Sequence, residues 1–320
     1  MTPTAHALLE HLFDYAGLFP PAALDVGDAA GHYDRYRSHA DAWMLGRFIA
    51  PAGRLADGEE MVDLVGAQNG RPWRVSVLGA APDEGEDWTG AALRTLSIAQ
   101  SFEAETDGRA VCDRFEIRLP ADLAMSPDRL ADALLALDEA YRQGGATGPR
   151  AALEVPFLEH PGTTAPAAQA VAEANARTGR PAFAVKLRCG GVTADLVPGV
   201  ERLAGAIHDV VRAGAPFKAT AGLHHPLPGH DDAVGARMHG FMGVFGGAIL
   251  ARLHGLDRDA LAEVLDDADA SHWSIGDELR WTTLSASAAE VADGRSQLAL
   301  SFGSCSFDEP REDLRALGWI

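Results

Sequence analysis

Short apolar runs alternate with longer stretches of helical periodicity along the 320-residue chain, and this alternation constrains the fold most strongly. Short runs of this kind, bounded by turn residues, are typical of buried strands. Eight runs have this character: Leu12–Tyr15, Arg47–Ala50, Arg74–Leu78, Arg114–Leu119, Ala152–Val155, Ala182–Leu187, Phe217–Thr220 and Leu298–Phe302. The first of them also fits a helix over Ala5–Phe13.

Helical patterns separate the strands. They cover Gly27–Arg37, Gly58–Ala67, Thr89–Glu105, Pro127–Arg142, Ala165–Thr178 and Val200–Ala213. Eight strand–helix repeats in a chain of this length predict an α/β fold, a (β/α)8 TIM barrel forming a single domain over residues 1–320. A doubly wound open sheet is the alternative, but no GxGxxG fingerprint follows an early strand.

One connection is much longer than the others, the one between the seventh and eighth strands. Its Pro-, Gly-, His- and Asp-rich beginning, His225–Ala236, is typical of a loop. Helical patterns follow at Arg237–Leu253, Asp257–Leu265 and Ser285–Ala292. We therefore expect an extra helical insertion over about residues 226–295.

Composition excludes several classes of partner. The net charge of −19 and the pI of about 4.9 argue against binding to nucleic acid or to an acidic membrane surface. No apolar stretch is long enough to span a bilayer. The three cysteines form no CxxC pair, which favours reduced thiols and a cytoplasmic location.

The Met238–Leu253 stretch packs either on the barrel or on a neighbouring subunit, so a homo-oligomer is one interpretation.

Strand parity places charged side chains inside the barrel. Residues two apart in a strand share a face, and in four successive strands the apolar residues oppose charged ones. The inward residues are then Glu116, Arg118, Glu154, Lys186, Arg188, Lys218 and, after the last, Thr220. The charged residues among them sum to four cations and two anions, so we expect a positive pocket that accepts a small anionic metabolite.

A lysine among other cations suggests a specific chemistry. Desolvation and neighbouring positive charge lower the pKa of an amine, and a neutral amine attacks carbonyl groups to form a Schiff base. We expect Lys186 to be this nucleophile, Lys218 to lower its pKa, and Glu154 or Glu116 to move protons. The alternative for either lysine is a salt bridge to Glu154 or Glu116 without chemistry.

The same residues resemble a known family. FDYAGLFPPAAL carries Asp14, LEVPFL carries Glu154, VKLRCGGVTAD carries Lys186, FKATAGLHH carries Lys218, and SFGSCSF carries Ser304 and Ser306. Strand by strand, the chain resembles the deoxyribose-phosphate aldolase family of class I aldolases, which are (β/α)8 barrels. The resemblance implies a Schiff base on Lys186, an assisting Lys218, a catalytic Asp14, a phosphate-binding turn at Ser304 and Ser306, and no cofactor.

The chain departs from this family at three places. The fourth strand has Glu116 and Arg118 where the family has an inward Asp. The position two after the lysine is small in the family and is Arg188 here, where it either crowds the substrate or grips an anion. The turn after the seventh strand, which helps to hold phosphate in the family, contains His224 and His225.

Histidines cluster after the seventh strand: His224, His225, His230 and His239. They fit acid–base or anion-binding duty. Alternatively, His224, His225 and His239, with Glu154, Asp231 or Asp232, hold a divalent metal such as Zn²⁺. A third interpretation is that the histidines lie on an exposed polar loop without a function of this kind.

Three functions follow from these patterns. The first is a carbon–carbon lyase acting through a lysine Schiff base on a small anionic carbonyl substrate. The second is a metal-dependent hydrolase or lyase that uses the histidine cluster, and the third is a barrel that binds an anionic metabolite without turnover.

Overall fold

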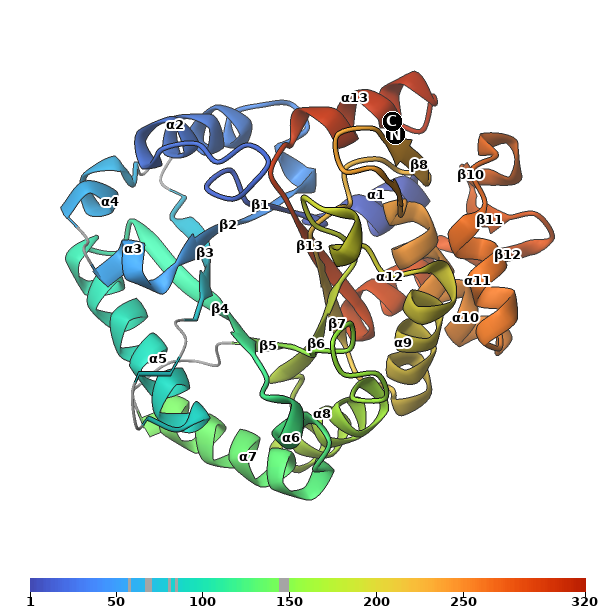
Figure 1. The fold of residues 1–320 in the computed structure, drawn as a ribbon. Helices are drawn as coiled ribbons and strands as arrows, with labels where there is room; N and C mark the ends of the chain where they lie inside the picture. Colours follow the sequence, from blue (N-terminus) through green and yellow to red (C-terminus); the bar gives the residue numbers. More distant parts are fainter. Residues whose placement is uncertain (57–58, 67–70, 80–81, 84–85, 144–149) are drawn as a thin grey trace.

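The computed structural model describes residues 1–56, 59–66, 71–79, 82–83, 86–143 and 150–320. Eight parallel strands close into a barrel in the order β1-β13-β7-β6-β5-β4-β3-β2 (Figure 1). The strands are β1 (Phe13–Tyr15), β2 (Leu45–Pro51), β3 (Trp73–Leu78), β4 (Ala110–Arg118), β5 (Arg150–Glu154), β6 (Phe183–Arg188), β7 (Phe217–Thr220) and β13 (Ala299–Ser304). Each coincides with a predicted strand to within a few residues, so the TIM-barrel prediction is confirmed.

Helices surround the barrel (Figure 1). They are α1 (Pro3–Leu9), α2 (Val26–Arg37), α3 (Ala52–Ala56), α4 (Glu59–Leu64), α5 (Trp88–Glu105), α6 (Ala121–Ala124), α7 (Pro127–Gln143), α8 (Thr164–Thr178), α9 (Val200–Ala213) and α13 (Asp308–Ala316). The predicted helices of the barrel are confirmed, although Gly58 and Ala67 at the ends of one prediction lie outside the described residues. No helix in the described ranges has both the length and the apolar composition to cross a membrane.

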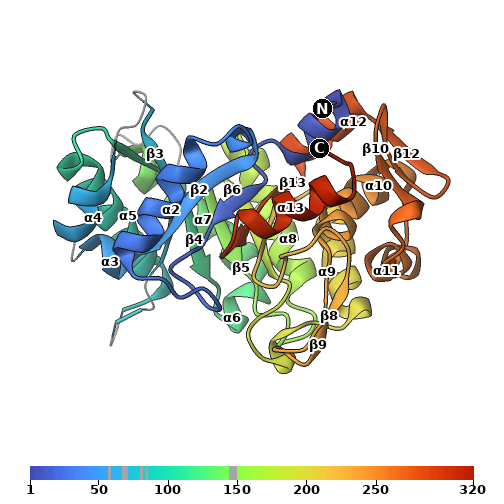
Figure 2. The same ribbon diagram turned by 90° about the horizontal axis from the view of Figure 1, so that it is seen from above.

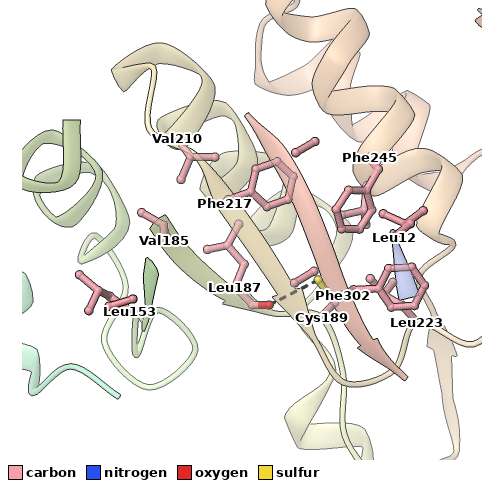
Figure 3. Packing of buried hydrophobic residues seen from close by; sticks show 14 of the residues in the cluster. Leu12, Leu153, Val185, Leu187, Cys189, Val210, Phe217, Leu223, Phe245 and Phe302 are labelled. Carbon is pink, nitrogen blue, oxygen red and sulfur yellow. Dashed lines mark hydrogen bonds between the residues drawn. The ribbon is translucent and has the colours of Figure 1, made fainter. Parts of the chain in front are cut away.

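The apolar face of each strand packs under the helices, as strand parity predicts. Val185 of β6 and Phe217 of β7 are fully buried, and they lie beside Val210 of α9 (Figure 3). Leu153 and Leu187 are buried on the same outer face. The opposite side chains of β4 to β7 therefore point toward the barrel axis, and this is where the charged residues gather.

The long connection between β7 and β13 is not wholly helical, which corrects the prediction for about residues 226–295. A hairpin of β8 (Gly229–Asp231) and β9 (Ala236–Met238) replaces the expected loop. A π-helical turn (Met242–Gly246), α10 (Gly247–His254) and α11 (Arg258–Asp266) follow. They precede a three-stranded antiparallel sheet of β10 (Trp273–Ile275), β11 (Glu278–Trp281) and β12 (Leu284–Ser287), seen beside the barrel in Figure 2.

Helix capping explains why the last predicted helix of this connection begins late. Helix α12 (Ala288–Gln297) begins after Ser287, whose hydroxyl and amide pair with Glu290 in a capping box. The residues before this cap are left to pair as β12. These strands of three or four residues are too short for a two-residue alternation to stand out in the sequence.

Gly240, at the start of the π-helical turn, gives a test of this packing. A Cβ there would lie 2.5 Å from the Cα of Leu227, and backbone hydrogen bonds from Phe241 to His225 and from Met242 to Pro226 hold the two segments together.

We expect Gly240→Ala to lower the free energy of unfolding by about 1–3 kcal/mol in chemical denaturation, because the backbone must move. Gly205→Ala in α9 meets open space and is the control, expected to stabilise by up to about 1 kcal/mol. Equal stability of Gly240→Ala and the unaltered protein would contradict this account.

Candidate functional site

The two inward lysines lie side by side. Lys186 of β6 and Lys218 of β7 are register partners, and only 3% and 0% of their surfaces are exposed. Of the 27 lysines and arginines in the chain, these two are the only lysines. The other 25 are arginines, so lysine occurs in this chain only in the barrel interior.

Lys186 is held between two carboxylates. Its Nζ lies 2.9 Å from Oε2 of Glu116 and 2.9 Å from Oε2 of Glu154. Burial by itself lowers the pKa of this amine, but the two carboxylates outweigh burial and hold the pKa above its usual value. Lys186 is therefore an ammonium ion at rest, and the prediction that neighbouring cations lower its pKa is wrong for the free protein.

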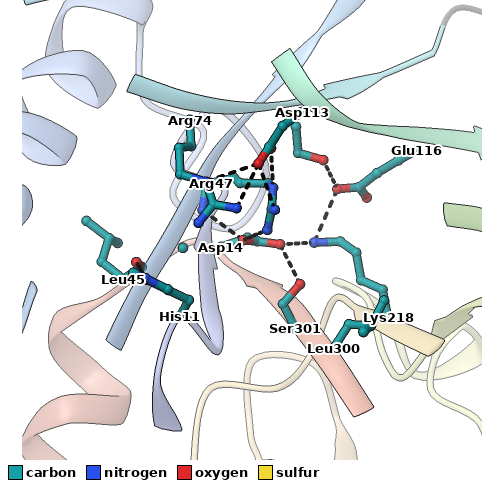
Figure 4. Close-up of polar contacts among 12 residues, drawn as sticks. His11, Asp14, Leu45, Arg47, Arg74, Asp113, Glu116, Lys218, Leu300 and Ser301 are labelled. Carbon is teal, nitrogen blue, oxygen red and sulfur yellow. Dashed lines mark hydrogen bonds and ion pairs between the residues drawn. The ribbon is translucent and has the colours of Figure 1, made fainter. Parts of the chain in front are cut away.

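Lys218 is held deeper in the barrel. Its Nζ forms ion pairs with Oδ2 of Asp14 and, at 3.2 Å, with Oε1 of Glu116 (Figure 4). Asp14 also accepts hydrogen bonds from the Ser301 hydroxyl and from the Arg47 backbone amide, both at 2.8 Å. Burial raises the pKa of Asp14, but Lys218 and Arg47 more than offset this effect, so the pKa is lowered and Asp14 stays ionised.

Glu116 joins the two lysines. One carboxylate oxygen contacts Lys218 and accepts a 2.6 Å hydrogen bond from Ser76, and the other oxygen contacts Lys186. Both cations overcome the effect of burial and keep the pKa of Glu116 far below its usual value. Glu154 then bridges from Lys186 to Arg188, whose Nη2 lies 3.2 Å from Oε1.

The result is one continuous ion-pair chain across the barrel. It comprises Asp14, Lys218, Glu116, Lys186, Glu154 and Arg188. Three carboxylates balance three cations along it, and the members that line the pocket are two carboxylates and two cations, so the prediction of a positive pocket is wrong. The prediction counted Arg118, whose side chain is exposed, and Lys218, which does not line the pocket.

A pocket of about 300 Å³ opens above this ion-pair chain. It lies at the carboxyl ends of the strands, where TIM-barrel enzymes have their active sites. Its polar lining is Glu116, Glu154, Lys186, Arg188, Thr220 and His224. Its apolar lining includes Phe19, Pro21, Ile49, Leu78, Val192 and Leu196. Asp14 and Lys218 do not line the pocket, so they act on it through Glu116.

Two predicted substrate ligands lie outside the pocket. The Arg118 side chain is 61% exposed and pairs with Glu159 at 2.7 Å, because β4 ends at this residue and its side chain has left the barrel. The His225 side chain is 58% exposed and contacts Asp313 of α13 at 2.6 Å. The prediction that Arg118 points into the barrel is wrong, and His225 has no part in the pocket wall.

The Gly/Ser turn after β13 is used internally. The Ser304 hydroxyl donates a 2.6 Å hydrogen bond to the Ser306 carbonyl oxygen, and the Ser306 hydroxyl accepts one from the Glu309 amide at the start of α13. Gly303 and Cys305 line the pocket, but Ser304 and Ser306 do not. Neither serine therefore occupies the substrate-binding position that the sequence predicts.

The three candidate metal ligands are held apart. His224 lies at the pocket wall with its Nδ1 3.3 Å from Glu309, whereas His225 pairs with Asp313. His239 is buried, and its Nε2 donates to the Pro198 carbonyl oxygen at 2.8 Å. Within the described ranges, no group of three or more His, Cys, Asp or Glu residues is arranged to hold a metal ion.

Sequence reasoning missed Arg114, which is 3% exposed and lies two residues before Glu116 on β4. Its Nε and Nη1 have no hydrogen-bond partner among the described residues. Burial, with help from Arg47, lowers the pKa of Arg114 to about 9. Its parity with Glu116 was the signal that would have revealed it.

The polar partners Ser76, Ser301 and Arg47 were missed as well. Arg47 continues the polar interior on the side of Asp14 away from Lys218, because its guanidinium pairs with Asp113, which also binds Arg74 at 2.7 Å (Figure 4). Serines are common in strands, and their charged partners come from other strands. No local pattern marks them.

Cys305 faces His224 at the pocket wall, with its Sγ 3.9 Å from Nδ1. Burial raises the pKa of this thiol to about 11, so Cys305 is protonated at neutral pH. This favours a wall residue over a nucleophile.

No protein-family model matches the chain, and no curated protein sequence matches it either.

The ion-pair chain gives the protein a defined pH window of stability. Carboxylates with a lowered pKa stabilise the fold above about pH 5 and lose this effect as the pH falls, whereas Lys186, with a raised pKa, loses its contribution only above its usual value of 10.5. Asp14→Asn removes one buried carboxylate, and we expect it to cost about 3–5 kcal/mol at pH 7 and to flatten the decline between about pH 5 and 3.

Urea denaturation at several pH values measures both effects. Asp232→Asn, at a fully exposed carboxylate, is the control and is expected to follow the unaltered protein. An Asp14→Asn variant with unchanged stability and unchanged acid sensitivity would show that the chain of ion pairs does not stabilise the fold.

Proposed function

We propose that the protein is a carbon–carbon lyase that forms a Schiff base between Lys186 and a small anionic carbonyl substrate. The observation that carries the proposal is the position of the Lys186 amine in the pocket wall, 2.9 Å from each of two carboxylates. A carbonyl carbon in the pocket can reach Nζ, and the amine has two neighbours that can take its proton.

Proton transfer prepares the nucleophile. Lys186 gives one proton to Glu154, whose side chain at the pocket wall is 11% exposed against 1% for Glu116, and becomes a neutral amine. Its lone pair forms a bond to the carbonyl carbon, and a second proton moves from the nitrogen to the carbonyl oxygen, which becomes a hydroxyl group. Glu154 returns its proton to this hydroxyl, which leaves as water, and a protonated imine remains.

The imine then serves as an electron sink. The bond that breaks joins the carbon next to the imine carbon to the following carbon, and its electron pair flows toward the imine nitrogen. The hydroxyl on that following carbon loses its proton, and an aldehyde forms. Protonation of the resulting enamine and attack by water release the second product and restore Lys186. Thr220 and His224 line the pocket and are available to bind the reacting hydroxyls.

The deeper residues keep the nucleophile in place. Lys218 and Asp14 fix the orientation of Glu116, and Glu116 fixes Lys186. When Lys186 transfers its proton, Lys218 still neutralises Glu116, so the buried carboxylate is never left unpaired. Asp14 and Lys218 are therefore positioning residues.

A barrel that binds an anion without turnover is the second candidate. Its support is the resting state of Lys186, which is a fully paired ammonium ion. In that function Arg188 and Lys186 hold an anionic metabolite, and no covalent bond forms.

Borohydride trapping separates these two functions. Hydride transfer to the imine carbon makes the adduct permanent, and the adduct adds the mass of the carbonyl compound less one oxygen atom. With only two lysines in the chain, peptide mass spectrometry locates it without ambiguity. We expect the adduct on Lys186 and its loss in Lys186→Arg, because arginine keeps the charge but cannot be deprotonated.

Arg118→Lys is the matched control. It adds an exposed amine outside the pocket, which is expected to take up only background label. Labelling of Arg118→Lys at its new lysine as fast as Lys186, or no label on Lys186 with any carbonyl compound, would contradict the proposal.

A further inference from the structure

We infer that the substrate is a 2-oxo acid whose carboxylate binds Arg188 while its keto carbon reacts with Lys186. The inference rests on the proposed Schiff-base function and specifies its substrate class. Arg188 then determines specificity, in addition to its contact with Glu154.

The spacing of the two cations supports this assignment. Lys186 and Arg188 lie on the same face of β6, and the Glu154 carboxylate bridges them, with one oxygen 2.9 Å from Nζ and the other 3.2 Å from Nη2. A single carboxylate group therefore reaches both cations. In a 2-oxo acid the keto carbon and the carboxylate are joined by a single bond, so one small molecule can reach both cations.

Arg188 also has unused binding capacity. A guanidinium carries five N–H donors in a planar fork, and of these only Nη2 has a hydrogen-bond partner among the described residues. The side chain is 32% exposed and lies in the pocket lining. Its other N–H groups can therefore donate hydrogen bonds to a second carboxylate while Nη2 stays bound to Glu154.

A phosphate group fits the pocket less well. The Ser304 hydroxyl donates within its own turn, the Ser306 hydroxyl accepts from the Glu309 amide of α13, and neither serine lines the pocket. Gly190 and Gly222, in the turns after β6 and β7, pack on each other so closely that a Cβ on Gly190 would lie 2.8 Å from the Gly222 Cα. These glycines serve the contact between the two turns. The balanced charges around Arg188 favour a monoanion over a dianion.

The rest of the pocket accommodates the second half of the substrate. Beyond Lys186 and Arg188, the lining of the cavity of about 300 Å³ includes the apolar side chains of Phe19, Ile49, Leu78, Val192 and Leu196. Cleavage of a 4-hydroxy-2-oxo acid breaks its C3–C4 bond, with the electron pair going to the imine and the hydroxyl proton to a base. The products are an aldehyde, which lies against the apolar wall, and a shorter 2-oxo acid, which water releases from Lys186.

Trapping with matched carbonyl compounds tests the inference. Pyruvate and acetone carry the same methyl ketone and differ in a carboxylate against a methyl group, and hydroxyacetone phosphate supplies a phosphorylated methyl ketone. We expect half-saturation of Lys186 labelling with pyruvate at a concentration at least about 10-fold lower than with acetone, as a charge-assisted hydrogen bond provides. Hydroxyacetone phosphate is expected to show no such advantage over acetone.

Arg188→Gln is expected to raise the half-saturating concentration of pyruvate by about 10- to 100-fold more than that of acetone. The acetone measurement reports what the loss of the Arg188–Glu154 pair does to Lys186 itself. Arg188→Lys, which keeps the charge without the fork, is expected to lie between. Arg118→Gln, the same change outside the pocket, is expected to alter neither compound.

The outcomes distinguish the two proposals. Equal labelling by pyruvate and acetone, a preference for hydroxyacetone phosphate over pyruvate, or an Arg188→Gln variant with unchanged pyruvate dependence would overturn the 2-oxo acid assignment and leave the Schiff base intact. No label on Lys186 with any of the three compounds would overturn both.

Discussion

The interior of this barrel depends on Glu116, a carboxylate that is 1% exposed and placed between two ammonium groups. An unpaired charge costs far more free energy when buried than at the surface. Each residue of the ion-pair chain that runs from Asp14 to Arg188 therefore requires its neighbours. TIM-barrel interiors are normally filled by branched apolar side chains. Here the apolar residues of β4 to β7 pack outward under the helices, and the charged residues replace the usual core at the level of the pocket.

The choice of lysine over arginine connects this arrangement with chemistry. Apart from the ion pairs of Lys186 and Lys218, every ion pair between a carboxylate and a lysine or arginine in the described part of the protein is made by an arginine. A purely structural pair inside the barrel would be served as well by arginine, which binds carboxylates in a fork. Lysine differs in that it can lose its proton and act as a nucleophile. The restriction of lysine to Lys186 and Lys218 therefore supports a role for at least one amine in covalent chemistry.

Sequence periodicity was sufficient for the barrel and for most of its inward charges, because both depend on local alternation along single strands. It correctly placed Glu116, Glu154, Lys186 and Lys218, and it failed for Arg118, where the strand ends. Ser304, Ser306 and His225 were misplaced because their partners come from their own turn or from α13. The sign of the charge around the pocket was wrong because the Arg118 side chain is exposed and Lys218 lies deeper than the pocket, paired with Asp14. The pKa of Lys186 required the contacts between strands, which no single strand contains.

The most direct measurement is NMR of protein labelled with ¹³C at lysine Cε, because the chain has only two lysines. The Lys186 signal is the one that disappears in Lys186→Arg. The account predicts that this signal keeps its ammonium position from neutral pH to above 10.5, the usual lysine value, and moves when pyruvate is added. A Lys186 signal that titrates well below pH 10, or one that does not respond to any carbonyl compound, would contradict it.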